Sequence, residues 1–305
     1  TSAAHCGTCQ RTCPLAETCS AGLCALPRAV DLAVGEGHAC VVTSRGAVGC
    51  WGENSDGQLG AGTSELRRYA SHSSRFGAST AVATSAGTTC AIALDGRVFC
   101  DGHNRYGERG VGNAASFALP TVVSDLTDVR AITGTARHFC AEHHDGVWCW
   151  GWGPGLLEER TPVQLVPGGS DIGLGGGTLC GFGGPVDGLW CMGSDEYGQL
   201  GDDTVLPSCF WVEPTFPLVW EIPCSSAPLA VDTALPHDMV AVGDAFTCSA
   251  DHESIACWGD NSHGQGLTPP PASVDRPLLI TVQSPDSAAL TTLSAGHDHA
   301  CVRRA

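Results

Sequence analysis

Residues 35–60 read GEGHACVVTSRGAVGCWGENSDGQLG, and this order of residues returns several times along the chain. Two cysteines, Cys40 and Cys50, stand on either side of the turn signal Ser44-Arg45-Gly46, with valines close to each of them. β-Branched residues around a glycine-containing turn are typical of a β-hairpin. The stretch therefore predicts two antiparallel strands with one cysteine on each.

Cysteine pairs at nearly the same spacing recur in four later units. They are Cys90 with Cys100, Cys140 with Cys149, Cys180 with Cys191, and Cys248 with Cys257. Three of these pairs enclose Asp-Gly, a strong hairpin signal, and the last encloses the weaker turn 251–254. We expect a disulfide across each hairpin, and closing so short a loop contributes roughly 2–3 kcal/mol to stability.

Three further features recur in phase with the cysteines. Trp-Gly follows the second cysteine at Trp51, Trp150 and Trp258. A glycine-rich loop comes next, at residues 54–60, 104–110, 195–201 and 261–266. Apolar segments then follow, at residues 120–123, 162–166 and 277–282, and others lead back to the next unit, at residues 32–34, 129–132 and 239–242. Each unit thus predicts about four strands, which is the signature of a β-propeller blade.

The recurring motif resembles the regulator of chromosome condensation repeat family in its disulfide-bearing bacterial form. The resemblance rests on Gly-x-x-His-x-Cys, on Asp-Gly-x-Val-x-Cys-Trp-Gly and on Asn-x-x-Gly-Gln-Leu-Gly, and it covers residues 29–305. It implies a propeller, usually of seven blades in this family. The family includes a guanine-nucleotide exchange factor acting on chromatin and a secreted inhibitor of β-lactamases, so the resemblance predicts fold rather than function.

The length of the repeat region predicts the number of blades. Residues 29–305 allow about 46 residues per blade for six blades and about 40 for seven. We therefore expect an all-β propeller of six, alternatively seven, four-stranded blades. The last unit has Cys301 but no second strand, whereas Gly22-Leu23-Cys24 resembles a missing second half. We expect this N-terminal strand to close the ring and Cys24 to pair with Cys301.

This closure divides the chain into a cysteine-rich segment, residues 1–23, and a propeller, residues 24–305. The remaining cysteines of the segment are Cys6, Cys9, Cys13 and Cys19. They predict two local disulfides whose connectivity the sequence leaves open, with a zinc site as the alternative. The segment is similar to leaders that precede propellers on some bacterial surface proteins, and that resemblance implies a lipid anchor upstream of residue 1.

Charge and cysteine content limit the classes of function. The chain carries 32 Asp and Glu against 15 Lys and Arg, a formal net charge of −17, which argues against nucleic acid as a partner. No apolar run approaches the roughly 20 residues of a transmembrane segment. The chain has 18 cysteines, a content that indicates an oxidising compartment, so we expect a secreted or bacterial cell-surface protein.

Two groups of residues resemble metal sites, each with a structural alternative. The loop Asn54-Ser55-Asp56-Gly57 resembles a calcium loop, but capping of a tight turn explains the same residues. His38, His138 and His299 recur two residues before the first cysteine and can line one level of a propeller, but they also suit structural hydrogen bonds. We therefore expect no metal and no cofactor, with calcium as the alternative.

One insertion breaks the repeat and is the best lead to function. Cys180 and Cys248 are 68 residues apart, and the excess contains Cys209 and Cys224, which predict a further disulfide. Between them stand the aromatic residues Phe210, Trp211, Phe216 and Trp220. Aromatic side chains on a loop clamped at its base suit a preorganised contact surface. The alternative is that they cap the propeller.

These observations favour a non-enzymatic recognition scaffold. We expect it to bind a protein or glycan through one propeller face and the inserted loop, residues 209–224. One alternative is a structural subunit that self-assembles outside the cell. Another is a hydrolase or lyase at the propeller axis, with His38, His138, His299 and Asp298 as the candidates, although no catalytic motif is present in the sequence.

Overall fold

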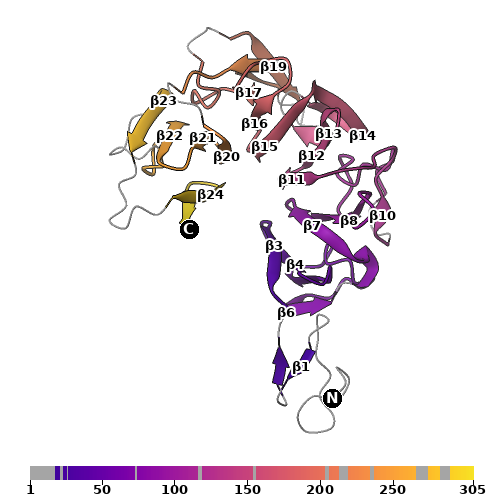
Figure 1. Ribbon diagram of the computed structural model, residues 1–305. Helices are drawn as coiled ribbons and strands as arrows, with labels where there is room; N and C mark the ends of the chain where they lie inside the picture. The colour runs from indigo at the N-terminus through magenta and orange to yellow at the C-terminus, as the bar shows by residue number, and fades with distance from the viewer. Residues whose placement is uncertain are drawn as a thin grey trace. The chain divides into compact units, whose positions relative to one another are not determined.

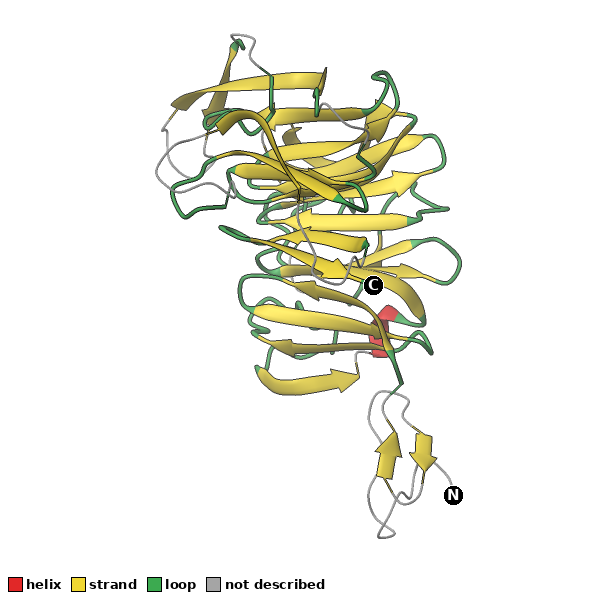
Figure 2. Ribbon diagram, turned by 60° about the vertical axis from the view of Figure 1, so that its left-hand side comes forward, coloured by secondary structure: helices red, strands yellow, loops and turns green. Residues whose placement is uncertain are grey.

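The computed structural model describes residues 18–20, 23–25, 27–72, 74–115, 119–153, 156–202, 206–212, 219–233, 237–265, 274–281 and 289–305. Strands and turns make up almost all of this part, and its helical content is a single 3-10 turn at Ser74–Phe76 (Figure 2). It contains no helix that is long and apolar enough to span a membrane. The fold is therefore all-β, as predicted.

The strands form antiparallel sheets in chain order. The first sheet is β3 (Ala29–Val34), β4 (His38–Thr43), β5 (Val48–Gly52) and β6 (Arg67–His72), and the second is β7 (Ser79–Thr84), β8 (Thr88–Ala93), β9 (Val98–Gly102) and β10 (Thr121–Val122). The third is β11 (Ala131–Thr135), β12 (His138–His143), β13 (Gly146–Gly153) and β14 (Leu156–Pro167). The fourth has five strands, β15 (Gly169–Gly175), β16 (Thr178–Gly183), β17 (Leu189–Ser194), β18 (Ser208–Val212) and β19 (Val219–Ala230). The fifth is β20 (Met239–Val242), β21 (Phe246–Ala250), β22 (Ser254–Gly259) and β23 (Val274–Thr281), and a two-stranded sheet of β24 (Leu290–Ala295) and β25 (Ala300–Arg304) follows.

The blade count differs from the prediction. The described residues form five complete blades, not six or seven, because the sixth unit contributes only β24 and β25. The strand expected to complete that unit is β2 (Leu23–Ala25), which instead pairs with β1 (Thr18–Ser20).

The expected Cys24–Cys301 disulfide is absent, and that prediction was wrong. Cys301 is free and exposed, while Cys24 lies opposite Cys19 in the β1–β2 hairpin. Pairing across a two-residue connection costs far less chain entropy than pairing with a strand near the other end of the chain. The hairpin also spans the domain boundary expected between residues 23 and 24. Cys6, Cys9 and Cys13 lie outside the described residues.

The chain divides into two compact units. Unit 1 is residues 1–144 with 148–152 and 158–163, and unit 2 is residues 145–147 with 153–157 and 164–305. In unit 1, β7 contacts both β3 and β11, and in unit 2, β20 contacts both β15 and β24 (Figure 1). The first strand of each sheet thus packs on its neighbours, as the blades of a propeller do.

The hydrophobic cores lie between neighbouring sheets. One core of unit 1 joins Val42 and Leu59, from the first sequence repeat, to Val82 and Ala91 of the second sheet. One core of unit 2 joins Leu189 and Leu200 to residues of the fifth sheet, including Trp258. Burial of apolar surface between sheets is therefore the main term that holds each stack together.

The strand β3 has no cover within unit 1. Its Val30, Leu32 and Val34 are 55%, 60% and 72% exposed, whereas Val82 at the corresponding place in β7 is 4% exposed beneath the first sheet. We call these three valine and leucine positions the β3 face. An uncovered row of apolar side chains is unusual for a soluble β-sheet and indicates a missing neighbour.

Six disulfides are present in the described residues. Five cross the predicted hairpins, Cys40–Cys50, Cys90–Cys100, Cys140–Cys149, Cys180–Cys191 and Cys248–Cys257, with Cα–Cα distances of 4.1–4.2 Å. The sixth, Cys209–Cys224, joins β18 to β19 with a Cα–Cα distance of 5.7 Å. The predicted pairings at these twelve cysteines are confirmed. Such a density of disulfides indicates an oxidising environment.

Candidate functional site

The loops that resembled calcium sites are capped by their own side chains. The Asn54 Oδ1 accepts a hydrogen bond from the Leu59 backbone N–H at 3.0 Å, and Asn54 Nδ2 donates to two backbone carbonyls further along the loop. Asn104 and Asp195 accept the corresponding backbone bond in their loops. These contacts support the turn-capping interpretation of the loops, because each one satisfies a backbone group that the turn leaves unpaired.

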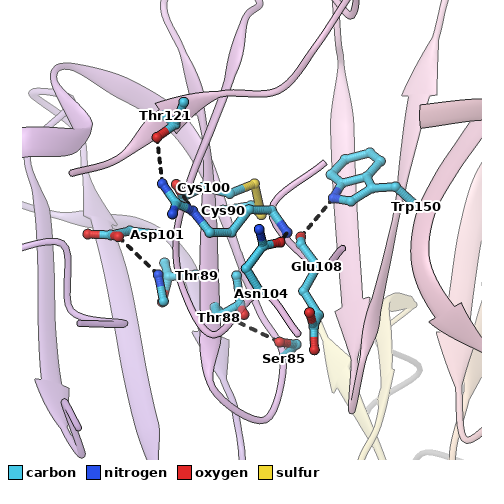
Figure 3. The surroundings of a disulfide bond; sticks show 12 residues. Ser85, Thr88, Thr89, Cys90, Cys100, Asp101, Asn104, Glu108, Thr121 and Trp150 are labelled. Carbon is cyan, nitrogen blue, oxygen red and sulfur yellow. Dashed lines mark hydrogen bonds between the residues drawn. A yellow bond between two sulfur atoms is a disulfide. The ribbon is translucent and has the colours of Figure 1, made fainter. Parts of the chain in front are cut away.

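Tryptophans of the Trp-Gly motif fasten one sheet to the next. Trp150 Nε1 donates to the backbone carbonyl of Glu108 at 2.9 Å, and Trp258 Nε1 donates to that of Gln199 at 2.9 Å (Figure 3 shows the first pair). Both indoles are fully buried. Gly201 has a φ of +70°, and a Cβ there would lie 2.7 Å from Trp258 Nε1, so this loop needs glycine. These tryptophans are structural, as expected.

The second sheet departs from the repeat by burying two charges. Asp101 stands where other units have tryptophan, and Arg109 stands where Leu59 and Leu200 lie; Asp101 and Arg109 are each 1% exposed. Burial raises the pKa of Asp101 to about 6, and the attraction of Arg109 offsets only part of this effect. The Arg109 guanidinium donates to the backbone carbonyls of Cys100, Ala115 and Leu119 and to Thr121 Oγ1.

In the same loop Glu108 stands where the loop of the fourth sheet has Gln199, and it forms a second polar pair with His103. Glu108 Oε2 accepts from the Tyr106 backbone N–H at 2.8 Å, as Gln199 Oε1 accepts from Tyr197 in its own loop. Glu108 Oε1 also lies 2.8 Å from His103 Nδ1, and this hydrogen bond is the largest cause of a raised pKa for His103. The charged variants of the loop therefore keep the architecture of the uncharged ones.

One of the repeat histidines, His38, lies at a contact between two sheets. His38 Nε2 forms a 2.8 Å hydrogen bond with Thr89 Oγ1 of the second sheet. Burial lowers the pKa of both His38 and His138 to about 4, whereas His299 is exposed. None of the three belongs to a cluster of metal-ligating side chains among the described residues. The contact of His38 with Thr89 supports the structural interpretation for that residue.

The inserted segment forms an additional hairpin on the fourth sheet. β18 pairs with the first half of β19, and the second half of β19 pairs with β17 as the outer strand of the blade. The register places Trp211 directly opposite Trp220, and Phe210 opposite Glu221. Since successive residues of a strand alternate between faces, the two tryptophan positions share one face and Phe210 has the other. Phe216 lies outside the described residues.

The disulfide Cys209–Cys224 closes the base of this hairpin. Cys209 lies opposite Ile222, two residues before Cys224, and Cys224 is fully buried and pairs with Ser194 of β17. The bond therefore ties the additional strand to the part of β19 that belongs to the blade. Among the described residues the other four complete sheets have no fifth strand, so the blade architecture does not require this hairpin.

An arginine–aromatic cluster in unit 1 was not foreseen from the sequence. It consists of Arg105, Tyr106, Arg137 and Trp152. The Arg137 guanidinium lies 4.9 Å from the centre of the Tyr106 ring and 5.1 Å from that of Trp152, and Arg105 lies 5.6 Å from Tyr106. Arg105 is exposed and Arg137 is half-buried, and cation–π contacts fix the direction of both side chains. The signal in the sequence was Arg105-Tyr106, which replaces the Ser55-Asp56 of the first loop.

A His–Ser–Asp network in the fifth sheet does not have the geometry of a catalytic triad. His237 Nδ1 lies 2.5 Å from Ser249 Oγ, and Ser254 Oγ donates to Asp251 Oδ1 at 2.9 Å. Both serines are buried, and Asp251 takes its hydrogen bond from Ser254 rather than from the imidazole. Neither hydroxyl can reach a substrate in this arrangement, so the network is structural.

Comparison with known proteins identifies the repeat. Residues 29–58 match the model of the regulator of chromosome condensation (RCC1) repeat. The chain thus carries the repeat that its motifs resembled. No curated protein matches the sequence.

Solved structures extend the likeness to the whole fold. Yeast RCC1 (Prp20), solved bound to Kap60, aligns with a TM-score of 0.74 at 16% identity over 91% of this chain and 66% of the yeast chain. Prp20p from Saccharomyces cerevisiae, studied with its binding to Gsp1p and histones, gives 0.73 at 16% identity over 91% and 68%. Human WBSCR16 gives 0.56 at 17% identity over 90% and 86%. The likeness shows the β-propeller fold, and the chain spans about two thirds of the length of its yeast neighbour.

Proposed function

We propose that this protein is a non-enzymatic recognition scaffold that binds a protein or glycan partner through the β18–β19 hairpin. The additional hairpin carries the proposal, because it is the element that the blade architecture does not need. Its two paired strands and the disulfide at its base hold its backbone in one arrangement at the edge of the fourth sheet, with the Trp211 and Trp220 positions opposite each other. A surface that is ordered before binding loses less entropy when its partner docks.

The arginine–aromatic cluster supports the same function from a second surface. Arg105 is an exposed cation and Arg137 a half-buried one, on a chain with a formal net charge of −17. Arginine and aromatic side chains are the types enriched where binding energy concentrates. The cluster lies at the end of the third sheet that carries the β11–β12 turn, and the inserted hairpin leaves the fourth sheet at its equivalent end, after β17.

The partner class follows from charge and from the solved neighbours. Yeast Prp20 is bound by Kap60, and its structure was studied with its binding to Gsp1p and histones, so this fold presents protein-binding surfaces. The acidic chain repels nucleic acid and favours partners of neutral or basic surface. The disulfides support placement outside the cell or on a bacterial surface, and the resemblance of the N-terminal segment to surface leaders supports an anchor upstream.

A pull-down from the native secretome or cell envelope tests the proposal. The intact protein is compared with a variant in which residues 210–221 become a Gly-Ser linker, leaving Cys209 and Cys224 in place. The control variant is Tyr69→Ser, which removes an aromatic side chain that is 83% exposed on the first sheet. We expect a partner that the intact protein and the control retain and the loop variant loses. Equal capture by all three proteins would contradict a role for the hairpin.

A second candidate function, self-assembly, is favoured by the β3 face. Val30, Leu32 and Val34 are an apolar row that unit 1 leaves uncovered, and a second copy of the chain is one cover for it. Light scattering of the wild type and of Val34→Asp decides the question. A wild-type oligomer that dissociates in the variant supports assembly. If the wild type is a monomer and Val34→Asp is less stable than the wild type, the residues that cover the β3 face belong to the same chain.

A further inference from the structure

The sixth sheet ends in an open strand edge. Among the described residues β25 pairs with β24 alone. In each complete sheet the strand equivalent to β25 has a further neighbour on its other side. These neighbours are the third strands β5, β9, β13, β17 and β22. The outer edge of β25 is therefore unpaired within the part of the chain that the structure describes.

β25 has the geometry of the strand that carries the first cysteine in a complete sheet. Each first cysteine lies opposite the residue seven positions before it, on the inner strand, and Cys301 lies opposite Ser294 of β24 in the same way. Leu290 of β24 is buried in a core shared with the fifth sheet, including Phe246 and Ile255. This packing holds the edge of β25 in a defined position.

The backbone groups at the open edge follow from the pairing with β24. The Gly296 N–H donates to the His299 carbonyl at 2.8 Å, and hydrogen-bonded pairs alternate along antiparallel strands. His299 and Cys301 thus direct their backbone groups towards β24. Ala300 and Val302 direct theirs outward, on either side of the exposed Cys301, and are ready to pair with another strand.

The five complete sheets show which strand fits this edge. Their first cysteines are fully buried, and each forms a disulfide with a cysteine of the third strand. The residue two positions after that second cysteine is always a glycine with a φ of +97° to +119°. These glycines are Gly52, Gly102, Gly151, Gly193 and Gly259. A Cβ on any of them would lie 2.2–2.6 Å from a backbone carbonyl oxygen, so the position requires glycine.

The carbonyl that excludes a side chain also orients the third strand. It belongs to the residue three positions before the first cysteine, and it accepts a hydrogen bond of 2.8–3.0 Å from the backbone N–H three positions after the second cysteine. All five complete sheets have this bond. The equivalent carbonyl before Cys301 is that of Asp298. The edge of β25 thus calls for a strand with the motif Cys-x-Gly, followed by a residue with a free backbone N–H.

The remaining cysteines of the sequence do not have this motif. The cysteines outside the six described disulfides are Cys6, Cys9, Cys13, Cys19, Cys24 and Cys301, and none has glycine two residues later. Cys24 is followed there by Leu26, which agrees with its place opposite Cys19 rather than on β25. In a second copy of β25 the position is Arg303, so two such edges do not suit each other in this register.

We propose that the open edge of β25 binds an extended strand of a partner protein that carries Cys-x-Gly, and that Cys301 forms a disulfide with its cysteine. The added strand pairs with Ala300 and Val302, as in strand addition to other sheet edges, and the glycine supplies specificity. This surface shares no residue with the β18–β19 hairpin and goes beyond the function proposed for it.

The covalent step is a thiol–disulfide exchange. The partner cysteine arrives as a mixed disulfide with a small thiol such as glutathione, and the Cys301 thiolate attacks the partner sulfur. One S–S bond breaks and one forms, and the small thiol leaves as a thiolate that takes up the proton released by Cys301. The number of disulfides is unchanged, so no further oxidant is needed.

A peptide with the sequence of residues 47–58, AVGCWGENSDGQ, tests the edge. It is added to the full chain as its glutathione disulfide, and mass spectrometry with peptide mapping gives the equilibrium constant for linkage to Cys301. The matched control is the same peptide with Gly52→Ala. We expect the glycine peptide to be favoured by at least about tenfold, because alanine meets a backbone oxygen at 2.4 Å and a φ of +108°.

Two variants of the protein complete the test. Cys301→Ser should abolish this linkage, and Val302→Pro should weaken it about fivefold or more, because it removes an outward N–H but no bond to β24. Circular dichroism confirms that both variants keep the fold. Equal linkage of the two peptides to Cys301 would reduce it to an accessible thiol, and no linkage of either would also overturn the proposal. So would mapping of the isolated protein that finds Cys301 joined to another cysteine of this chain, in the same copy or in a second one.

Discussion

Acidification should destabilise the protein through His38. The side chain is 4% exposed and bonded to Thr89, and burial lowers its pKa to about 4 from an ordinary value of 6.5. The unfolded chain therefore takes up a proton at a higher pH than the folded one does. The stability that neutral His38 contributes is complete above pH 6.5 and is lost as the pH falls through 4.

The size of the effect follows from the two pKa values. At pH 5 the histidine of the unfolded chain is protonated and that of the folded chain is not. The ordinary histidine pKa lies about 1.5 units above this pH, and this difference sets the size of the effect. At about 1.36 kcal/mol per unit, the free energy of unfolding falls by about 2 kcal/mol between pH 7 and pH 5 because of this residue. Protonation of the buried Asp101, whose pKa is raised to about 6, acts in the opposite direction. A comparison between variants is therefore needed.

Urea unfolding of the oxidised protein at pH 7 and pH 5 provides that comparison. His38→Gln keeps a side chain that can hydrogen-bond to Thr89 but does not titrate. Its loss of stability between the two pH values should be about 2 kcal/mol smaller than that of the wild type. Asp101 and His138 contribute equally to both proteins and cancel in the difference.

His299→Gln is the matched control. It removes the histidine at the same repeat position, but His299 is exposed, so we expect it to keep the pH dependence of the wild type. If wild type and His38→Gln lose the same stability between pH 7 and pH 5, within about 0.5 kcal/mol, the argument from a buried neutral imidazole is wrong.

Three other substitutions give expected changes in the same unfolding assay. Trp150→Phe should lower the free energy of unfolding by about 1–2 kcal/mol, because it leaves the buried Glu108 carbonyl without its donor, and a wild-type value would show that water replaces the indole. Replacing Cys90 and Cys100 together by alanine should cost roughly 2–3 kcal/mol under non-reducing conditions, and an unchanged stability would contradict the hairpin disulfide. Arg109→Leu should cost about 3–5 kcal/mol, because it removes a cation that attracts the buried Asp101 and also the donors to the carbonyls of Ala115 and Leu119. Adding Asp101→Asn should restore part of that loss, and a double variant less stable than the single one would refute the coupling.

Short-range features of the fold were predictable from the sequence. The strands on either side of each cysteine pair were predicted because a hairpin depends on a few adjacent residues, and β20 (Met239–Val242) coincides with the predicted return strand. The fold class and the six disulfides of the described residues depend on the same local signals. The position of the additional hairpin was predicted from the excess length between Cys180 and Cys248.

The sequence did not predict which of two distant strands pair with each other. The strand of Cys24 can pair with the nearby strand β1 or with the remote strand of Cys301, and the repeat pattern favoured the remote one. The burial of Arg109 depends on four acceptors, at Cys100, Ala115, Leu119 and Thr121, that no periodicity indicates. The arginine–aromatic cluster likewise depends on contacts between separate loops, which a single repeat unit does not contain.

The pattern of disulfides has a consequence for biosynthesis. Each of the five hairpin disulfides joins cysteines 9–11 residues apart, and the second cysteine of the first pair precedes the next pair by 40 residues. During oxidative folding the correct partner of each of these cysteines is therefore its nearest neighbour, at an effective concentration that no later cysteine matches. Oxidation can proceed in the order in which the chain emerges, one hairpin at a time, with little need for a disulfide isomerase to correct errors among these ten cysteines.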